Sequence, residues 1–263
     1  MKLIKNAEFG GERPLFESHD LRLENVIIRT GESAIKECSN IETVDCRFEG
    51  NYPFWHVHGF KIDRCYFDVG GRSALWYSDH LKMTDTIIDA PKMFREMDEI
   101  DIENVTMNDA DEVFWRCNGI RIKNLKLHGG TYPFMFSNNI YVDGLESNSK
   151  YVFQYVKNVE IHHAKITTKD AFWEVENVTI STIPNSTANT SAGIRRIYVW
   201  STATLPVSNR FAMHTTLFLK TVPSDLTATV PLSTARCKPI FTELLQISRT
   251  RCRDALWLTN SVP

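Results

Sequence analysis

One apolar pattern repeats nine times between residues 16 and 172, at steps of 19 to 21 residues, and it constrains the fold more than any other feature. Each repeat begins at an apolar anchor, and apolar or small residues recur 6, 8, 11 and 13 positions later, except that the first repeat is one residue short. Spacings of two are typical of strands, because side chains of a strand alternate between two faces. The anchors are Phe16, Ile35, Phe54, Leu75, Phe94, Phe114, Phe134, Phe153 and Phe172.

Two bends per repeat follow from this spacing. The gap of three between positions +8 and +11 breaks the alternation, and Asn104, Asn124 or Gly144 occupies it in different repeats. A second bend precedes position +6, where Asn or Gly recurs, as at Asn40 and Gly59. These two residue types tolerate positive φ better than others. Each repeat is therefore predicted to form a coil of three short strands.

A repeat of about 20 residues is too short to bury its own apolar face, so the repeats must stack. We therefore predict an all-β fold, a right-handed single-stranded parallel β-helix (solenoid) of about nine coils with an irregular C-terminal tail. The predicted divisions are an N-terminal cap at 1–15, the β-helix at 16–180 and an atypical segment at 181–263.

Residues 181–263 have a different composition. They hold three of the chain's 32 acidic residues and one glycine, and serine and threonine dominate. Such a segment is predicted to be a disordered tail, a genuine solenoid cap or partner-binding tail, or an out-of-frame translation. The third hypothesis rests on the codons: a one-base shift permits the apolar pattern to resume at repeats starting near 192 and 211. The nucleotide sequence across codon 180 decides between an intact gene and a frameshift.

Composition limits the partners and the location of the protein. A net charge of −2 argues against nucleic acid as the main partner. The apolar run at residues 1–4 is too short for a signal peptide, and no stretch approaches the length of a membrane span, so we expect a cytoplasmic protein with no membrane partner. Cys46 and Cys65 occupy neighbouring coils, close enough for a disulfide in principle, but without an export signal we expect buried reduced thiols.

The candidate functional site is a column of aromatic residues. All four tryptophans of the repeat region lie one position after an anchor, on the face expected to point outward. Aromatic rings flanked by polar groups suit a sugar-binding surface. The alternative is a structural role, in which a terminal segment covers the rings or the rings form a self-association face. We expect a non-catalytic binding or structural module whose partner is carbohydrate or protein. The candidate residues are Trp55, Trp76, Trp115, Trp173, His56, Tyr77, Glu96 and Arg116.

The alternative is a carbohydrate-active enzyme of the polysaccharide lyase or glycoside hydrolase type. Glu96 and Asp98 are the candidate acid and base, because Glu174 lies four coils from Glu96, about 19 Å away, and glycosidic cleavage needs carboxylates about 5 to 9.5 Å apart. The histidine pairs at 56/58 and 162/163 lack a third ligand at a suggestive spacing, and the sequence contains no glycine-rich phosphate loop. We therefore expect no metal and no cofactor, and assign no catalytic residue.

Three features carry a resemblance to a known family. They are the segment AEFGGERPLF at 7–16, the segment ALWYS at 74–78, and the Asn-Val-x-Ile style of each coil. Over about residues 1–180, and over the shifted reading of the tail, the chain resembles an uncharacterised bacterial family of domain-of-unknown-function proteins. The resemblance implies a short right-handed β-helix of the pectate-lyase-like (pectin lyase-like) superfamily and supplies no catalytic residues.

Overall fold

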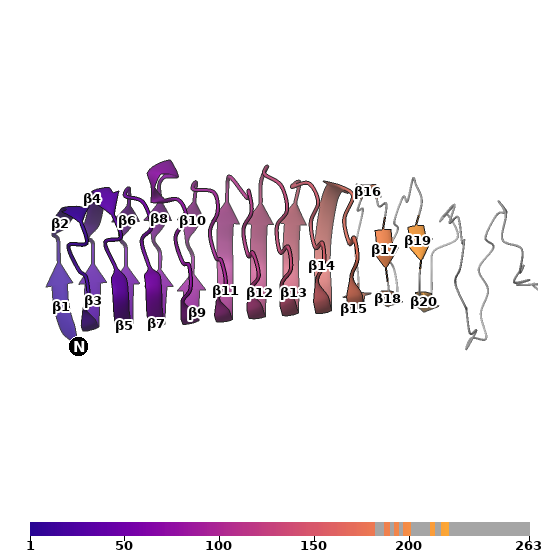
Figure 1. Ribbon diagram of the computed structural model, residues 1–263, viewed down its shortest axis with the longest axis horizontal. Coiled ribbons are helices and arrows are strands. Elements are labelled where there is room, and N and C mark those ends of the chain that lie inside the picture. Colours follow the sequence, from indigo (N-terminus) through magenta and orange to yellow (C-terminus); the bar gives the residue numbers. More distant parts are fainter. Residues whose placement is uncertain (182–186, 190–191, 195–196, 201–210, 214–216, 221–263) are drawn as a thin grey trace, which may run out of the picture.

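The computed structural model describes residues 1–181 together with 187–189, 192–194, 197–200, 211–213 and 217–220. Its strands lie side by side along one axis (Figure 1), and their pairings are parallel. This confirms the predicted all-β solenoid of about 9 turns, while its right-handedness stays a prediction. The strands are β1 (Lys2–Lys5), β2 (Glu8–Glu12), β3 (His19–Glu24), β4 (Ile27–Glu32), β5 (Lys36–Val44), β6 (Arg47–Phe48), β7 (Trp55–Asp63), β8 (Tyr66–Phe67), β9 (Asp79–Thr84), β10 (Ile87–Ile88), β11 (Asp98–Met107), β12 (Asn118–Leu127), β13 (Asn138–Ser147), β14 (Lys157–Lys169), β15 (Glu176–Ser181), β16 (Thr187–Asn189), β17 (Ala192–Ile194), β18 (Ile197–Trp200), β19 (Phe211–Met213) and β20 (Leu217–Lys220).

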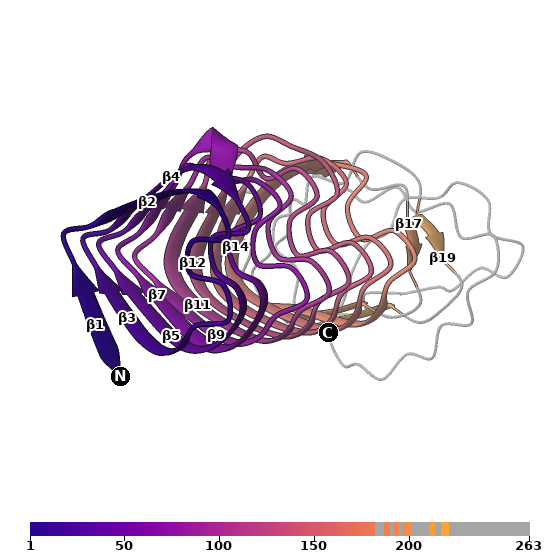
Figure 2. The same cartoon turned by 60° about the vertical axis from the view of Figure 1, so that its left-hand side comes forward.

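Equivalent positions of successive repeats stack directly on one another. In β7 and β9, Phe60 pairs with Leu81 and Ile62 with Met83, which are the +6 and +8 positions of adjacent coils. Figure 2 shows the coils nested one behind another with the same outline. In the later coils a single strand, as in β11, β12 and β13, runs through the first bend and spans positions that two strands share earlier in the chain. The sheet therefore positions every outward residue of a coil beside its counterparts about 4.8 Å away.

The two predicted bends are confirmed by the backbone. Asn40 and Gly59 at one bend have φ of 52° and 66°, and Asn104 and Gly144 at the other have φ of 56° and 83°. The left-handed conformation at these places is what favours Asn and Gly. Amides at the bends also stack along the axis, as Asn158 Nδ2 donates to Asn139 Oδ1 at 2.9 Å.

The third side of the coil differs from the predicted strand. Apart from the first residues of β5 and β7, where Lys36 pairs with Trp55, its pairings are isolated bridges such as that of Trp55 with Trp76. The reason is an alternating backbone: Tyr52, Phe54 and His56 all have positive φ, at 55°, 59° and 53°. Left-handed residues at alternate positions interrupt the regular pleat, yet amides here still bond to neighbouring coils, as Trp55 N does to Ile35 O at 3.1 Å. Positive φ is normally predicted from Gly, Asn or Asp, and bulky residues rarely adopt it, so the residue types on this side did not indicate the left-handed backbone.

The core is filled by the inward columns of the repeat. Phenylalanine rings of successive anchors stack with centroids 4.4 to 5.4 Å apart, from Phe94 through to Phe172. The first anchor is an exception, and here the sequence prediction is wrong. Leu15 is buried at 7% exposure, whereas Phe16 is 38% exposed, so Leu15 is the anchor and Phe16 lies outside. With this correction the first repeat has the same internal spacing as the others.

The ends of the solenoid extend the same pairing. β1 pairs with β3 and β2 with β4, so residues before the first anchor already form coil-like strands. Beyond Ser181, β18 pairs with β15 and β20 with β18. The disordered, capping and out-of-frame interpretations of 181–263 concern residues that lie mostly outside those described. In the described part, no helix is both long and apolar enough to cross a membrane.

Candidate functional site

The predicted aromatic column exists, and we call it the aromatic ridge: the side chains one and two positions after each anchor, from Phe16 to Trp173. Each tryptophan of the ridge is held by backbone hydrogen bonds to neighbouring coils. Trp115 N donates to Phe94 O at 2.9 Å, and the Trp76 carbonyl accepts from His56 N at 3.1 Å. The tryptophans are all half-buried, so the ridge lies against the coils instead of projecting from them.

Ring faces along the first line of the ridge are covered by neighbouring side chains. The rings of Trp55 and Trp76 have centroids 5.2 Å apart. The guanidinium of Arg95 then lies between two rings, 4.5 Å from the centroid of Trp76 and 5.3 Å from that of Trp115. Lys36 covers the other side of Trp55 at 5.9 Å. The result is one continuous stack in the order Lys36, Trp55, Trp76, Arg95 and Trp115, held by one ring–ring contact and three cation–π contacts.

The side chains also bend over the next coil. Trp76 Nε1 donates to the Lys92 carbonyl at 2.7 Å, and Gln154 at the same position of a later coil donates to the Asp170 carbonyl at 3.0 Å. Gln154 is consequently buried at 7% exposure, so the expectation that this whole column points outward is wrong for Gln154. A residue next to an anchor points away from the core, but a long side chain there can fold back and donate a hydrogen bond to a backbone carbonyl of the next coil.

The second line of the ridge holds the other predicted residues. His56 stacks on Tyr77 with centroids 5.2 Å apart, and Arg116 lies 5.5 Å over the ring of Phe136. Glu96 is exposed between these two groups in the same line. Trp173 is half-buried three coils beyond Trp115. The structure thus brings His56, Tyr77, Trp55 and Trp76 into one cluster, while Arg116 and Trp173 lie farther along.

Residue Arg95 is more central to the ridge than the sequence suggested. Its Nη2 is 2.7 Å from Glu112 Oε2, and its side chain is 22% exposed. Lys92 lies 3.4 Å from the other oxygen of Glu112. This carboxylate therefore fixes the cation between two tryptophans. An arginine between tryptophans of neighbouring repeats is the sequence signal for such a stack.

A second polar cluster, which sequence reasoning missed, lies on β7, β9 and β11. Asp79 bonds two imidazoles, with Oδ2 2.7 Å from His58 Nδ1 and Oδ1 2.7 Å from His80 Nδ1. His80 Nε2 lies 3.1 Å from Glu99 Oε2. Both ring nitrogens of His80 therefore face carboxylates, which suits the doubly protonated ring.

The charges of this cluster follow from its contacts. The hydrogen bond to Asp79, and then the charge of Glu99, raise the pKa of His80 above its ordinary value. Burial raises the pKa of Asp79, but hydrogen bonds from His80 and His58 outweigh it and the pKa is lowered. The cation on His80 and the anion on Asp79 stabilise each other.

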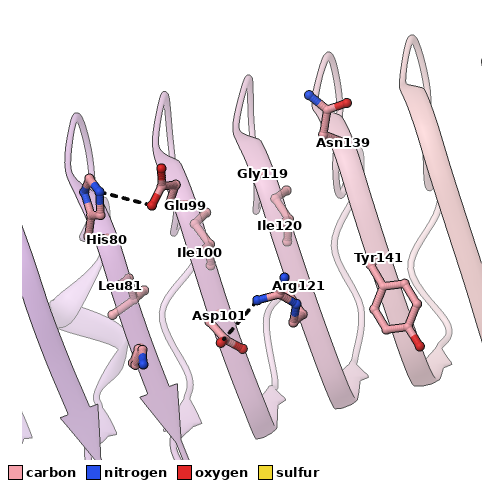
Figure 3. Close-up of a pocket in the computed structure, with 11 residues that line it drawn as sticks. His80, Leu81, Glu99, Ile100, Asp101, Gly119, Ile120, Arg121, Asn139 and Tyr141 are labelled. Carbon is pink, nitrogen blue, oxygen red and sulfur yellow. Dashed lines mark ion pairs between the residues drawn. The ribbon is translucent and has the colours of Figure 1, made fainter.

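Two side chains of this cluster, His80 and Glu99, border a hollow on the outer face of β9, β11, β12 and β13, which we call the central hollow (Figure 3). Its volume is about 430 Å³. Two further hollows of about 330 Å³ adjoin it, one sharing His80 and Lys82 with it and the other sharing Asn139 and Tyr141. The side chains of its two walls are His80, Glu99 and Asn139 on one side and Lys82, Asp101, Arg121 and Tyr141 on the other.

The remaining candidate residues are the acids Glu96 and Asp98, the histidines and the cysteines. Glu96 and Asp98 are both exposed, and Asp98 accepts a hydrogen bond from Asn118 at 3.0 Å. His163 bonds Asp143 at 2.6 Å and His162 bonds Glu160 at 2.7 Å. Among the described residues, no three His, Cys, Asp or Glu side chains converge as metal ligands. The four described cysteines are buried free thiols: Cys38, Cys46, Cys65 and Cys117.

Comparison with known protein families gives one match. The family described as protein of unknown function (DUF3737) matches residues 2–188. The chain belongs to this family. The match covers β1 through β15, hence the ridge and the central hollow, and it ends at residue 188 within the atypical segment. Neither curated proteins nor solved structures gave a match to this DUF3737 chain.

Proposed function

We propose that this protein is a non-catalytic, cytoplasmic interaction module that binds another protein through its aromatic ridge. The observation that carries the proposal is the orientation of the rings. The faces of Trp55 and Trp76 are taken up by each other and by Lys36 and Arg95, and the tryptophans are half-buried. A sugar needs a free ring face on which to stack, whereas a protein surface packs against ring edges and guanidinium groups alike.

The composition of the ridge supports the same choice. Protein interfaces are enriched in Trp, Tyr, Phe, Met and Arg, and these residue types recur along both lines of the ridge. Phe16 and Tyr155, near opposite ends of the ridge, are exposed large apolar residues, at 38% and 39%. Backbone bonds between coils hold the whole surface in place, so that little ordering is required when a partner binds.

A crosslinking experiment tests the ridge. A photoreactive phenylalanine analogue replaces Tyr155 on the ridge or, as control, the 48% exposed Ile87 on another face of the solenoid. We expect one protein to be crosslinked from position 155 and not from 87. With that protein purified, Tyr77→Ala is expected to weaken binding by about 2 kcal/mol, since a ring at the centre of an interface carries much of the affinity.

Three outcomes would contradict the proposal. They are equal crosslinking from both positions, unchanged affinity of Tyr77→Ala, and crosslinking only to a second copy of the chain, which would show self-association. A glycan-array signal that Trp76→Ala abolishes would instead favour carbohydrate as the ligand of the ridge.

A further inference from the structure

The bend before position +6 departs from its own rule at two adjacent coils. All described residues of this column have positive φ, and the residues are Asp, Asn or Gly in every coil except two. The exceptions are His80, with φ of 54°, and Glu99, with φ of 56°. Residues of these two types have positive φ elsewhere in the solenoid, as at His56 and Glu96, so the backbone alone does not set the pair apart. The distinguishing feature is that two longer ionisable side chains lie side by side in a column that otherwise holds short side chains or glycine.

The two exceptions form one wall of the central hollow. His80 Nε2 is 3.1 Å from Glu99 Oε2, and Asp79 holds the other nitrogen of the ring at 2.7 Å. The next coil has Gly119 in this column, and a Cβ there would meet only ordinary contacts at 3.5 Å or more. The missing side chain leaves the space between Glu99 and Asn139 open, as Figure 3 shows.

The opposite wall offers a loosely held ion pair and an aromatic ring. Arg121 and Asp101 approach only to 3.7 Å, with side chains 72% and 47% exposed. For comparison, Lys61 and Glu42 approach to 2.8 Å on the same sheet. Tyr141 is 40% exposed, and its ring contact is with His162, on the coil away from the hollow, at 5.5 Å. Unlike the tryptophans of the ridge, this ring has no aromatic or cationic contact on its Arg121 side among the described contacts.

We propose that the central hollow binds a neutral oligosaccharide. Sugar hydroxyls both donate and accept hydrogen bonds, and the walls supply both partners, with Glu99 and Asp101 as acceptors and Arg121 and Asn139 as donors. Tyr141 offers a ring on which the apolar face of a sugar stacks. Acids and bases are balanced around the hollow, which selects against a highly charged ligand.

The dimensions agree with this ligand. A volume of about 430 Å³ lies in the range of small-molecule sites. The adjoining hollows share residues with it at both ends, so a chain of sugars has a continuous path along the solenoid axis. This site lies on the outer face of β9, β11, β12 and β13 and is independent of the protein-binding function proposed for the ridge.

The test is a glycan array probed with the full chain, followed by calorimetric titration of the oligosaccharide that binds. Gly119→Asn is the decisive variant. Asn139 and Asn158 occupy the same column at positive φ, so we expect the fold to tolerate Asn at position 119. The added side chain would fill the hollow. We expect Gly119→Asn to abolish detectable binding, and Tyr141→Ala to weaken it about tenfold. Glu146→Gln, an exposed ion-paired residue outside the hollow, is the control and is expected to bind normally.

The proposal is overturned if no neutral glycan binds the wild-type chain, or if a glycan that binds does so equally well to Gly119→Asn. Circular dichroism confirms that each variant is folded. Crosslinking from position 155 is read separately, so failure of the hollow and failure of the ridge are distinguishable.

Discussion

Replacing Phe114 with alanine is expected to lower the free energy of unfolding by about 3–5 kcal/mol, the usual loss for a buried phenylalanine. Phe114 is fully buried, and its ring stacks on Phe94 at 4.4 Å and on Phe134 at 4.8 Å, nearly parallel to both. Removing it leaves a cavity between two rings that the hydrogen-bonded coils cannot close, because coil spacing is fixed by the parallel ladder. Urea denaturation followed by circular dichroism measures the loss.

Phe16→Ala is the matched control. Phe16 begins the repeat in the sequence pattern but is 38% exposed in the structure, so its loss is expected to change the unfolding free energy by less than about 0.5 kcal/mol. The pair thus tests the corrected position of the first anchor as well as the stack. Similar losses from both substitutions would show that Phe16 is a core residue and that Leu15 is not the anchor.

The period of the sequence was sufficient to predict the columns of this fold, because an alternating strand leaves few choices of side-chain direction. The bends at Asn and Gly were also predictable, because positive φ favours these residues. The first anchor is harder to place, since Leu15 and Phe16 are adjacent and both apolar. The internal spacing of the repeat favours Leu15, and the bonds from Leu15 N to Ala34 O and from Glu17 N to Lys36 O fix the register. Left-handed backbone at Phe54 and its equivalents had no sequence signal.

The candidate sites illustrate a second limit of a repeat pattern. A column shows which residues are neighbours, but the tilt of a ring depends on side chains about 20 residues away in both directions. The covered faces of Trp55 and Trp76 follow from Lys36 and Arg95, whose positions in the column are visible in the sequence but whose conformations are not. His80 and Glu99 were detectable in principle, as the residues that replace Asn or Gly at one bend.

Gly130→Ala is expected to destabilise the solenoid by about 3 kcal/mol or more, although the change adds a single methyl group. A Cβ at this position would lie 2.2 Å from Asp111 N and 2.4 Å from the carbonyl carbon of Ala110, both backbone atoms of the preceding coil. Those atoms are fixed by the ladder, so the clash is relieved only by separating coils. The left-handed φ of 66° adds a cost of about 1–2 kcal/mol.

Gly129→Ala separates these two causes. Gly129 has nearly the same φ, 64°, but a Cβ there would have no heavy atom within 4 Å, so only the backbone preference is lost. We expect a loss of about 1–2 kcal/mol for Gly129→Ala and a clearly larger one for Gly130→Ala, measured as shifts in the denaturation midpoint. Equal losses would mean that the coils separate freely at this bend. A larger loss for Gly130→Ala would show that close approach of neighbouring backbones, and not φ alone, requires glycine where the two coils meet.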